Sequence, residues 1–230
     1  MKKNLFIFLA LSYALFADAL PQSINTTVSD ITSTGEIQLS SSIPKGMSGI
    51  IIHNYGNGLS AITHTSISKG AGKASVANYT AILHENIPTV QTAVSIGDKV
   101  IFGDFYNNVL LIAPNQTAYQ QIKKRFNRTW IHPDAYALDF MKEGETSLNK
   151  NSLRKFAKKN QIGLILIVTS NKLLVLDPIS KQFIGETALV TNPNSALTPF
   201  YARFEQIDTS TFGFDEKNYT SYFKSVAGLK

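Results

Sequence analysis

The sequence predicts an α+β protein in which a β-rich N-terminal half, a small barrel or a sandwich, is followed by an α/β C-terminal half. Turn signals recur about every 8–12 residues over residues 35–114, which is typical of a compact all-β unit. After Pro114 the apolar residues follow a helical period. A continuous apolar run at residues 162–169 then predicts a strand that is buried on both faces.

Residues 1–19 are typical of a secretory signal peptide. A basic start at residues 1–3 precedes an uncharged, largely apolar run at residues 4–17 and an A-x-A-like cleavage site at residues 17–19. The apolar run is too short for a bilayer span, which needs about 20 residues. We therefore expect an exported chain with no transmembrane helix, located in the periplasm, at the outer-membrane surface or outside the cell.

The composition excludes several classes of function. The chain has no cysteine, so an exported form has no disulfide bonds, and thiol catalysis and cysteine-ligated zinc are excluded. Hydrophobic residues make up 43% of the chain, enough for a packed core to stabilise it. Loss of the leader removes Lys2, Lys3 and Asp18 and leaves a mildly basic chain without a dense basic run. We expect no nucleic-acid partner.

The first half, residues 20–114, is expected to contain a series of short strands. Residues 20–34 are rich in Ser, Thr and Asn and predict an extended leader or an edge strand. Further strands are predicted at residues 36–39, 48–55, 59–68, 74–83 and 88–94. Asn57 and Gly58 indicate a hairpin turn. Residues 94–115 predict a second hairpin, with Gly103 as a bulge or a point of close backbone approach.

The second half, residues 115–230, is expected to begin with helices and to pack against the first. The predicted helices run from the cap Asn115 to about Phe126, from the cap Asp134 with Leu138 and Met141 on its apolar face, and from Asn149 to Asn160 with Leu153, Phe156 and Ala157 inward. Strands are predicted at residues 162–169, 173–176, 183–190 and 200–207, and a helical tail at residues 216–227. The predicted boundary between the halves is at Pro114.

Few residues could carry catalysis. His53 and His64 lie on neighbouring predicted strands and could bind a metal, but no H-x-H or H-x-x-x-H spacing supports this, so no metal or cofactor is expected. Asp139 and Glu143 could act as acid and base, but they are four residues apart on one helix face, as is common on a surface helix. We expect no enzymatic activity.

Five N-x-S/T strings could accept a glycan in an exported protein. They begin at Asn25, Asn78, Asn115, Asn127 and Asn218. An acidic residue two positions earlier, Glu216, accompanies the last of these alone. This resembles the extended acceptor sequence of bacterial N-glycosylation, so Asn218 is the candidate.

The chain ends at Lys230. A C-terminal lysine presents an ammonium and a carboxylate a short distance apart, and kringle-type grooves accept such a pair between charged ends and aromatic walls. A terminal lysine is also common in proteins that bind nothing through it. The residues alone leave both interpretations open.

A series of motifs at residues 96–103, 106–107, 110–115, 132–134 and 162–164 resembles the N-terminal domain of bacterial plasminogen-binding surface proteins. The likeness covers roughly residues 35–210 and includes an export signal. It implies a cell-surface or envelope protein that captures host plasminogen, with the C-terminal lysine, here Lys230, implicated. Those proteins continue into a long, lysine-rich extension where this sequence stops, so the resemblance also allows shared ancestry without the binding activity.

We therefore expect an exported, non-enzymatic binding protein of the bacterial envelope or surface that captures host plasminogen through Lys230 and contributes to virulence. The first alternative is a periplasmic structural or assembly protein of an envelope machine, with no host ligand. The second is a small enzyme with metal chemistry at His53 and His64.

Overall fold

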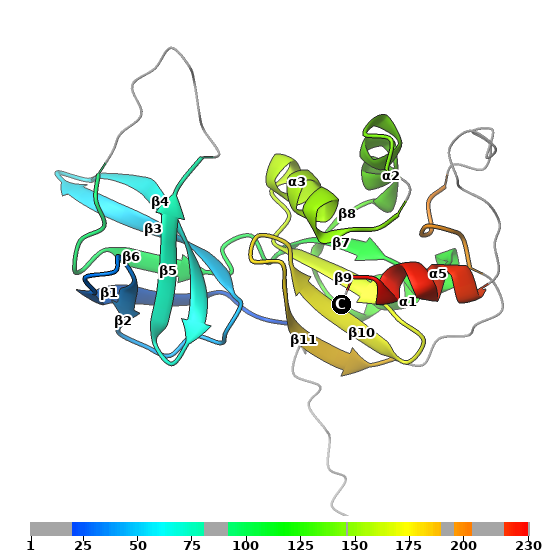
Figure 1. The fold of residues 1–230 in the computed structure, drawn as a ribbon, viewed down its shortest axis with the longest axis horizontal. Helices are drawn as coiled ribbons and strands as arrows, with labels where there is room; N and C mark the ends of the chain where they lie inside the picture. The colour runs from blue at the N-terminus through cyan, green and yellow to red at the C-terminus, as the bar shows by residue number, and fades with distance from the viewer. Residues whose placement is uncertain (1–19, 81–91, 146, 190–195, 204–218, 230) are drawn as a thin grey trace, which may run out of the picture.

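The computed structural model describes residues 20–80, 92–145, 147–189, 196–203 and 219–229, and Figure 1 shows these as a barrel beside a second sheet covered by helices. The predicted signal peptide, Asn218 and Lys230 lie outside the described residues.

Six strands form a closed antiparallel barrel in the order β1-β2-β5-β4-β3-β6. They are β1 (Ile24–Ile31), β2 (Ile37–Leu39), β3 (Ser48–Gly56), β4 (Leu59–Gly70), β5 (Lys73–Asn78) and β6 (Lys99–Phe102). A strand, β1, does lie within residues 20–34, but its predicted position at an edge is wrong, because β1 pairs with β2 on one side and with β6 on the other. Thr26 and Val28 alternate inward along β1, so this strand closes the barrel.

The hairpin turn predicted at Asn57 and Gly58 is present in the barrel, whereas two of the predicted strands differ from the structure. Asn57 and Gly58 have positive φ angles of 51° and 78° in the hairpin between β3 and β4, as an Asn-Gly turn requires. The strand predicted at 74–83 ends at Asn78. Of the strand predicted at 88–94, the described residues 92–94 are irregular and the remainder lies outside the described residues.

The second sheet has five strands in the order β11-β10-β9-β7-β8. Their bounds are β7 (Asn108–Ile112), β8 (Thr129–Ile131), β9 (Leu164–Val168), β10 (Lys172–Asp177) and β11 (Gln182–Ala188). β7 is parallel to β8 and β9, while β9, β10 and β11 form an antiparallel meander. Every residue of β9 is buried, which confirms the strand predicted from the continuous apolar run.

The hairpin predicted at residues 94–115 is wrong. β6 pairs with β1 and β3 in the barrel, whereas β7 pairs with β8 and β9 in the second sheet. The chain crosses between the sheets at residues 103–107, before the predicted boundary at Pro114, and we call this segment the crossing. Gly103 begins it with a φ of 72°, and a Cβ there would lie 2.7 Å from the Tyr106 ring, so the predicted close approach exists in a turn.

Four helices belong to the described part of the chain: α1 (Gln116–Arg125), α2 (Pro133–Lys142), α3 (Lys150–Asn160) and α5 (Tyr219–Ala227). The Asn115 side chain accepts a hydrogen bond from the Ala118 N–H at 2.9 Å and caps α1 as predicted. The cap of α2 is His132 and not Asp134, because Pro133 occupies the first helical position.

The helix faces differ from the prediction in one place. Leu138, predicted on the apolar face of α2, is 53% exposed. The buried face of α2 instead includes Tyr136, Ala137 and Phe140. The predicted stripe of α3 is correct, since Leu153, Phe156 and Ala157 are its buried residues. Residues 200–203, predicted to begin a strand, are irregular.

The second sheet separates two apolar clusters. Leu111, Leu166 and Val175 pack with α1 and with the barrel interior in one cluster. On the opposite face Ile112 and Ile167 pack with α2, α3 and α5. The barrel and the α1 face of the sheet therefore share one continuous core.

A buried carboxylate fixes the junction between the barrel and the second sheet. Asp177, fully buried at the end of β10, accepts the Ser48 N–H at 2.8 Å and the Tyr106 hydroxyl at 2.7 Å on Oδ2. Its Oδ1 accepts the N–H groups of Ile179 and Ser180, both at 2.9 Å. One side chain thus connects the barrel, the crossing and a turn of the sheet.

Candidate functional site

Two ion pairs join α2 and α3 on an exposed face of the second half. The Nζ of Lys159 lies 3.0 Å from Oδ1 of Asp139, and Lys155 pairs with Glu143. Four-residue spacing places the two carboxylates on one face of α2 and the two lysines on one face of α3. We call these four residues the α2–α3 ion-pair surface.

The two lysines of the α2–α3 ion-pair surface are open to solvent, Glu143 is partly exposed, and Asp139 is mostly buried beside a shallow depression. The side chains of Lys155 and Lys159 are 65% and 64% exposed. The hydrogen bond with Glu143 raises the pKa of Lys155, and the charge of Asp139 acts in the same direction. The depression, of about 150 Å³, includes Glu145 in its lining. The surface therefore presents ammonium and carboxylate groups side by side.

Buried contacts between α2 and α3 fix the position of the α2–α3 ion-pair surface. Beneath it, the hydroxyl of the buried Tyr136 lies 2.6 Å from Oγ of Ser152, which links α2 to α3. The rings of Tyr136 and Phe156 pack with their centroids 5.1 Å apart. The charged side chains consequently project from helices whose relative position is fixed by the core.

His132, Asp134 and Arg203 form a second polar cluster at the start of α2. Asp134 accepts the backbone N–H of Arg203 at 2.8 Å and its Nε–H at 2.7 Å. Burial opposes the charged carboxylate, but these bonds and the nearby His132 outweigh it and lower the pKa of Asp134. The cluster ties residues 196–203 to α2, which indicates a structural role.

Nδ1 of His132 accepts the backbone N–H of Asp134 at 3.2 Å, so the ring caps α2 in its neutral form. Nδ1 also lies 3.1 Å from Oδ1 of Asp134, a contact in which Nδ1 would have to carry a proton and could not accept the Asp134 N–H. Burial, opposed by the charge of Asp134 and assisted by that of Arg203, lowers the pKa of His132. This direction favours the neutral, capping form.

The His132 cap predicts a loss of stability in mild acid. A lowered pKa in the folded state means that the contribution of His132 is present above its unfolded pKa of about 6.5 and is lost as the pH falls below it. His132→Asn keeps a capping oxygen that does not titrate in this range. Between pH 7.5 and 5.5, the free energy of unfolding of the native chain should fall by about 0.5–1 kcal/mol more than that of the variant. Urea titrations at both pH values test this, and equal losses would contradict it.

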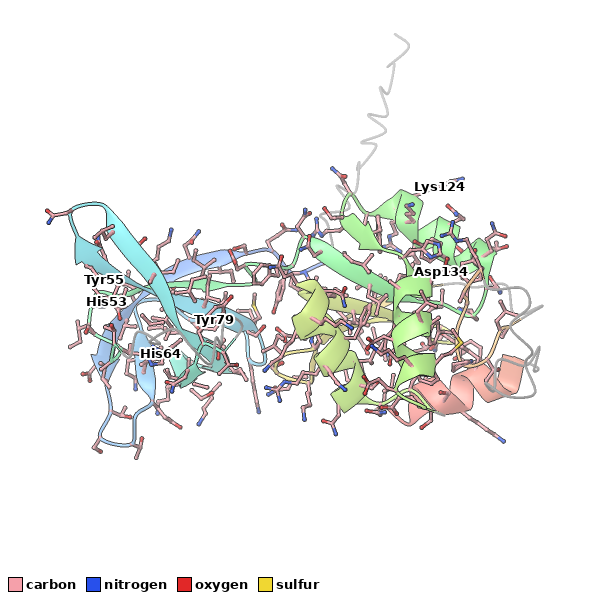
Figure 2. All side chains as sticks on the ribbon, turned by 90° about the horizontal axis from the view of Figure 1, so that it is seen from above. His53, Tyr55, His64, Tyr79, Lys124 and Asp134 are labelled. Carbon is pink, nitrogen blue, oxygen red and sulfur yellow. The ribbon has the colours of Figure 1, made fainter. Side chains whose placement is uncertain are left out.

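The far end of the barrel carries an Asp–His pair that the sequence did not reveal. Nδ1 of His53 lies 2.8 Å from Oδ1 of Asp98, a buried residue whose Oδ2 accepts the Ser95 N–H at 2.8 Å. The pair lines a broad groove of about 590 Å³. Tyr55, edge-on to His53 with ring centroids 4.7 Å apart, is exposed beside it. Figure 2 shows both residues on the barrel.

His53 and His64 are not directly opposed in the sheet, although the charge of Asp98, the partner of His53, also acts on His64. His53 pairs across the sheet with Ala61, and His64 with Ile51, so the two histidines are not opposite each other. Nδ1 of His64 lies 2.9 Å from the Thr63 hydroxyl. Within the described ranges, no three His, Asp or Glu side chains gather closely enough to hold a metal ion.

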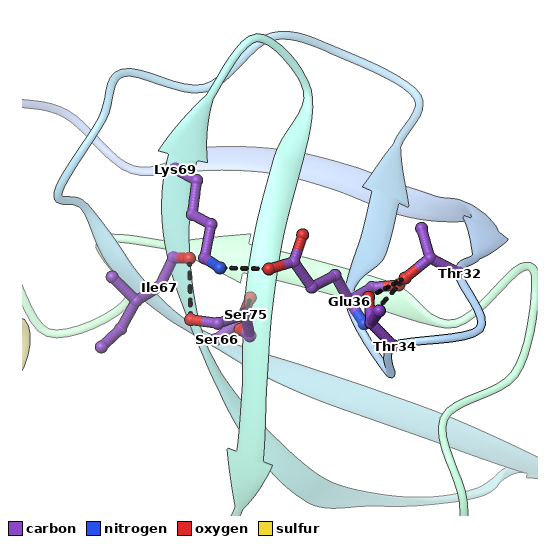
Figure 3. Close-up of polar contacts among 7 residues, drawn as sticks. All are labelled: Thr32, Thr34, Glu36, Ser66, Ile67, Lys69 and Ser75. Carbon is purple, nitrogen blue, oxygen red and sulfur yellow. Dashed lines mark hydrogen bonds and ion pairs between the residues drawn. The ribbon is translucent and has the colours of Figure 1, made fainter.

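Other exposed charged residues are not arranged as two ion pairs between two helices. Lys123, Lys124 and Arg125 are exposed in the last turn of α1, where cations stabilise the helix end. Figure 2 shows Lys124 on the second half, away from the barrel. On the barrel, Lys69 forms a single ion pair with Glu36, shown in Figure 3.

Sequence reasoning placed Asp139 and Glu143 on a surface helix but did not find their lysine partners. The equal four-residue spacing of Lys155 and Lys159 on the next helix was the available signal. The predicted site residues Lys230 and Asn218 both lie outside the described residues. In the described part of the chain, no helix is both long and apolar enough to cross a membrane.

Comparisons with known proteins identify relatives. A family model described as "Plasminogen-binding protein pgbA N-terminal" matches residues 23–227. Two curated relatives, each called plasminogen-binding protein PgbA and coming from Helicobacter pylori strains J99 and 26695, are 27% identical to the chain over 173 residues, or 73% of its length. The chain spans 38% of the length of each of these relatives. No solved structure matches it.

Proposed function

The chain belongs to the plasminogen-binding protein PgbA N-terminal family, and on this premise we propose that it is an exported, non-enzymatic protein of the bacterial envelope or surface that captures host plasminogen. The family match, which begins just after the predicted signal peptide, is the observation that carries the proposal. Two relatives bear the name of plasminogen-binding proteins. A role in host interaction and virulence would follow from plasminogen capture.

Lysine side chains are the proposed ligands. A kringle-type groove holds an ammonium against acidic groups and aromatic rings, and a neighbouring carboxylate against cationic groups. Lys230 offers both groups on one residue and is the first candidate. Asn218 remains a candidate glycosylation site in a host that has the modifying enzymes.

Plasminogen binding by the chain from residue 20 to residue 230 tests this function. Plasminogen in solution should bind the immobilised chain, and an excess of a free lysine analogue should reduce binding at least about tenfold, because the analogue occupies the same grooves. Deletion of Lys230 should weaken binding if that residue contributes. Binding that withstands both the analogue and the deletion would contradict lysine recognition.

One observation favours the alternative of a periplasmic structural or assembly protein. The chain spans 38% of the length of the named relatives, so their binding activity could reside in the remainder. Absence of plasminogen binding, together with recovery of the protein in a periplasmic fraction, would favour this alternative. Cleavage by protease added to intact cells would instead support a surface location.

A further inference from the structure

We infer that the α2–α3 ion-pair surface is a second contact for plasminogen, in which one lysine ammonium and a neighbouring carboxylate together enter a kringle-type groove. The inference rests on the proposed capture of plasminogen and assigns a contact to the folded part of the chain, separate from Lys230. Its residues are Asp139 on α2, Glu143 at the C-cap of α2, and Lys155 and Lys159 on α3.

The spacing of the four charges matches the ligand. Four residues advance an α-helix by about 6 Å. Because both pairs of like charges have this spacing, each lysine has one carboxylate in contact and another about 6 Å further along α2. Bond lengths place the ammonium of a free, extended lysine about 6–7 Å from its carboxylate. Glu143 is the more accessible carboxylate, since its side chain is 38% exposed and that of Asp139 only 13%. Lys159 with Glu143 therefore resembles a lysine with a free carboxylate.

The lysines are available to a partner even though each is paired. Both side chains are about two-thirds exposed, and exposed ion pairs contribute little to stability. A groove that supplies its own acidic residues can replace Asp139 as the partner of Lys159. The helices beneath are held by buried aromatic packing. The partner then does not have to order a flexible segment.

Other lysines lack this combination. The helix α1 has no acidic residue in its first turn and no carboxylate anywhere along its ten residues, so Lys123 and Lys124 stand without a helical carboxylate partner. Lys69 pairs with Glu36 on the barrel and Lys172 with Glu186 on the second sheet, so neither lysine lies on a helix. Lys123 and Lys124 thus provide a matched control, equal in number and charge to Lys155 and Lys159.

The experiment measures plasminogen binding to residues 20–230 and to four variants by surface plasmon resonance. The first variant, Lys155→Gln with Lys159→Gln, removes the ammonium groups. The second, Asp139→Asn with Glu143→Gln, removes the carboxylates and keeps the lysines. The third is the control, Lys123→Gln with Lys124→Gln. The fourth lacks Lys230. Circular dichroism melting curves identify any variant that is not folded.

We expect the Lys155/Lys159 variant to bind about tenfold more weakly than the native chain. The Asp139/Glu143 variant should also bind more weakly, by about threefold or more, although it carries two fewer negative charges. The Lys123/Lys124 control should stay within about twofold. This pattern would separate recognition of an ammonium–carboxylate pair from attraction by net charge.

Four results would overturn the inference. Unchanged binding by the Lys155/Lys159 variant, with loss of binding on removal of Lys230, would leave plasminogen capture intact and place it at the terminus alone. Equal losses in the control and the Lys155/Lys159 variant, or tighter binding by the Asp139/Glu143 variant, would indicate a net-charge effect. No binding by the native chain would refute the proposed function, and the inference with it.

Discussion

Replacement of Asp177 by alanine should lower the free energy of unfolding by about 3–5 kcal/mol. The carboxylate is fully buried and accepts four hydrogen bonds. Its removal leaves the buried Ser48 N–H and Tyr106 hydroxyl without an acceptor, and each such loss costs about 1–3 kcal/mol. The N–H groups of Ile179 and Ser180 lose their acceptor as well. Urea denaturation followed by circular dichroism and by the fluorescence of Trp130, the one tryptophan, measures the change.

Two further variants sharpen this test. Asp104→Ala makes the same chemical change at an exposed position of the crossing and should alter the free energy of unfolding by less than about 0.5 kcal/mol. Tyr106→Phe removes one donor, and its effect should largely vanish in an Asp177→Ala background, because both changes break the same bond. Additive effects of the two substitutions, or an Asp177→Ala variant as stable as the control, would show that the buried carboxylate does not hold the junction.

The sequence predicted local elements better than their partners. Hydrophobic periodicity located β9, α3 and the strands of the barrel, because alternation and helical spacing are local properties of the chain. The prediction of a hairpin at residues 94–115 was wrong because β6 and β7 are both short, apolar and mostly buried. These features do not specify the strand with which each of them pairs. The positive φ of Gly103 and the packing of Tyr106 turn the chain into a new sheet.

The sequence predicts which residues of the candidate site share a helix face, but not how the two helices pair. Helical spacing placed Asp139 and Glu143 on one exposed face, and the same argument applies to Lys155 and Lys159. Their pairing depends on how α2 and α3 lie on the second sheet, which involves the packing of residues far apart in the sequence. Asp177 precedes Pro178, which is typical of a turn, and two of its four hydrogen bonds are made within that turn. The other two, to Ser48 of the barrel and to Tyr106 of the crossing, depend on residues far away in the sequence.

Gly163→Ala should destabilise the fold by about 3 kcal/mol or more, because two backbone segments meet there. A Cβ at Gly163 would lie 2.3 Å from both the carbonyl carbon and the oxygen of Phe105, and 2.6 Å from the Tyr106 nitrogen. The Gly163 N–H also donates to the Asn108 carbonyl at 3.0 Å, so the glycine cannot move away without losing a hydrogen bond. The same denaturation measurement applies, with loss of soluble protein as the extreme result.

Gly185→Ala is the matched control. Gly185 lies in β11, and a Cβ there would contact only the Val175 side chain at an ordinary 3.6 Å, so the substitution should be neutral or stabilise the fold by up to about 1 kcal/mol. If both alanine variants were equally stable, the Phe105 backbone would have to move away from residue 163 by about 1 Å or more to make room for the new Cβ. Such a movement is incompatible with a crossing held by the Tyr106–Asp177 hydrogen bond at 2.7 Å. The Gly163 and Asp177 variants therefore test one junction by two independent means, steric contact and hydrogen bonding.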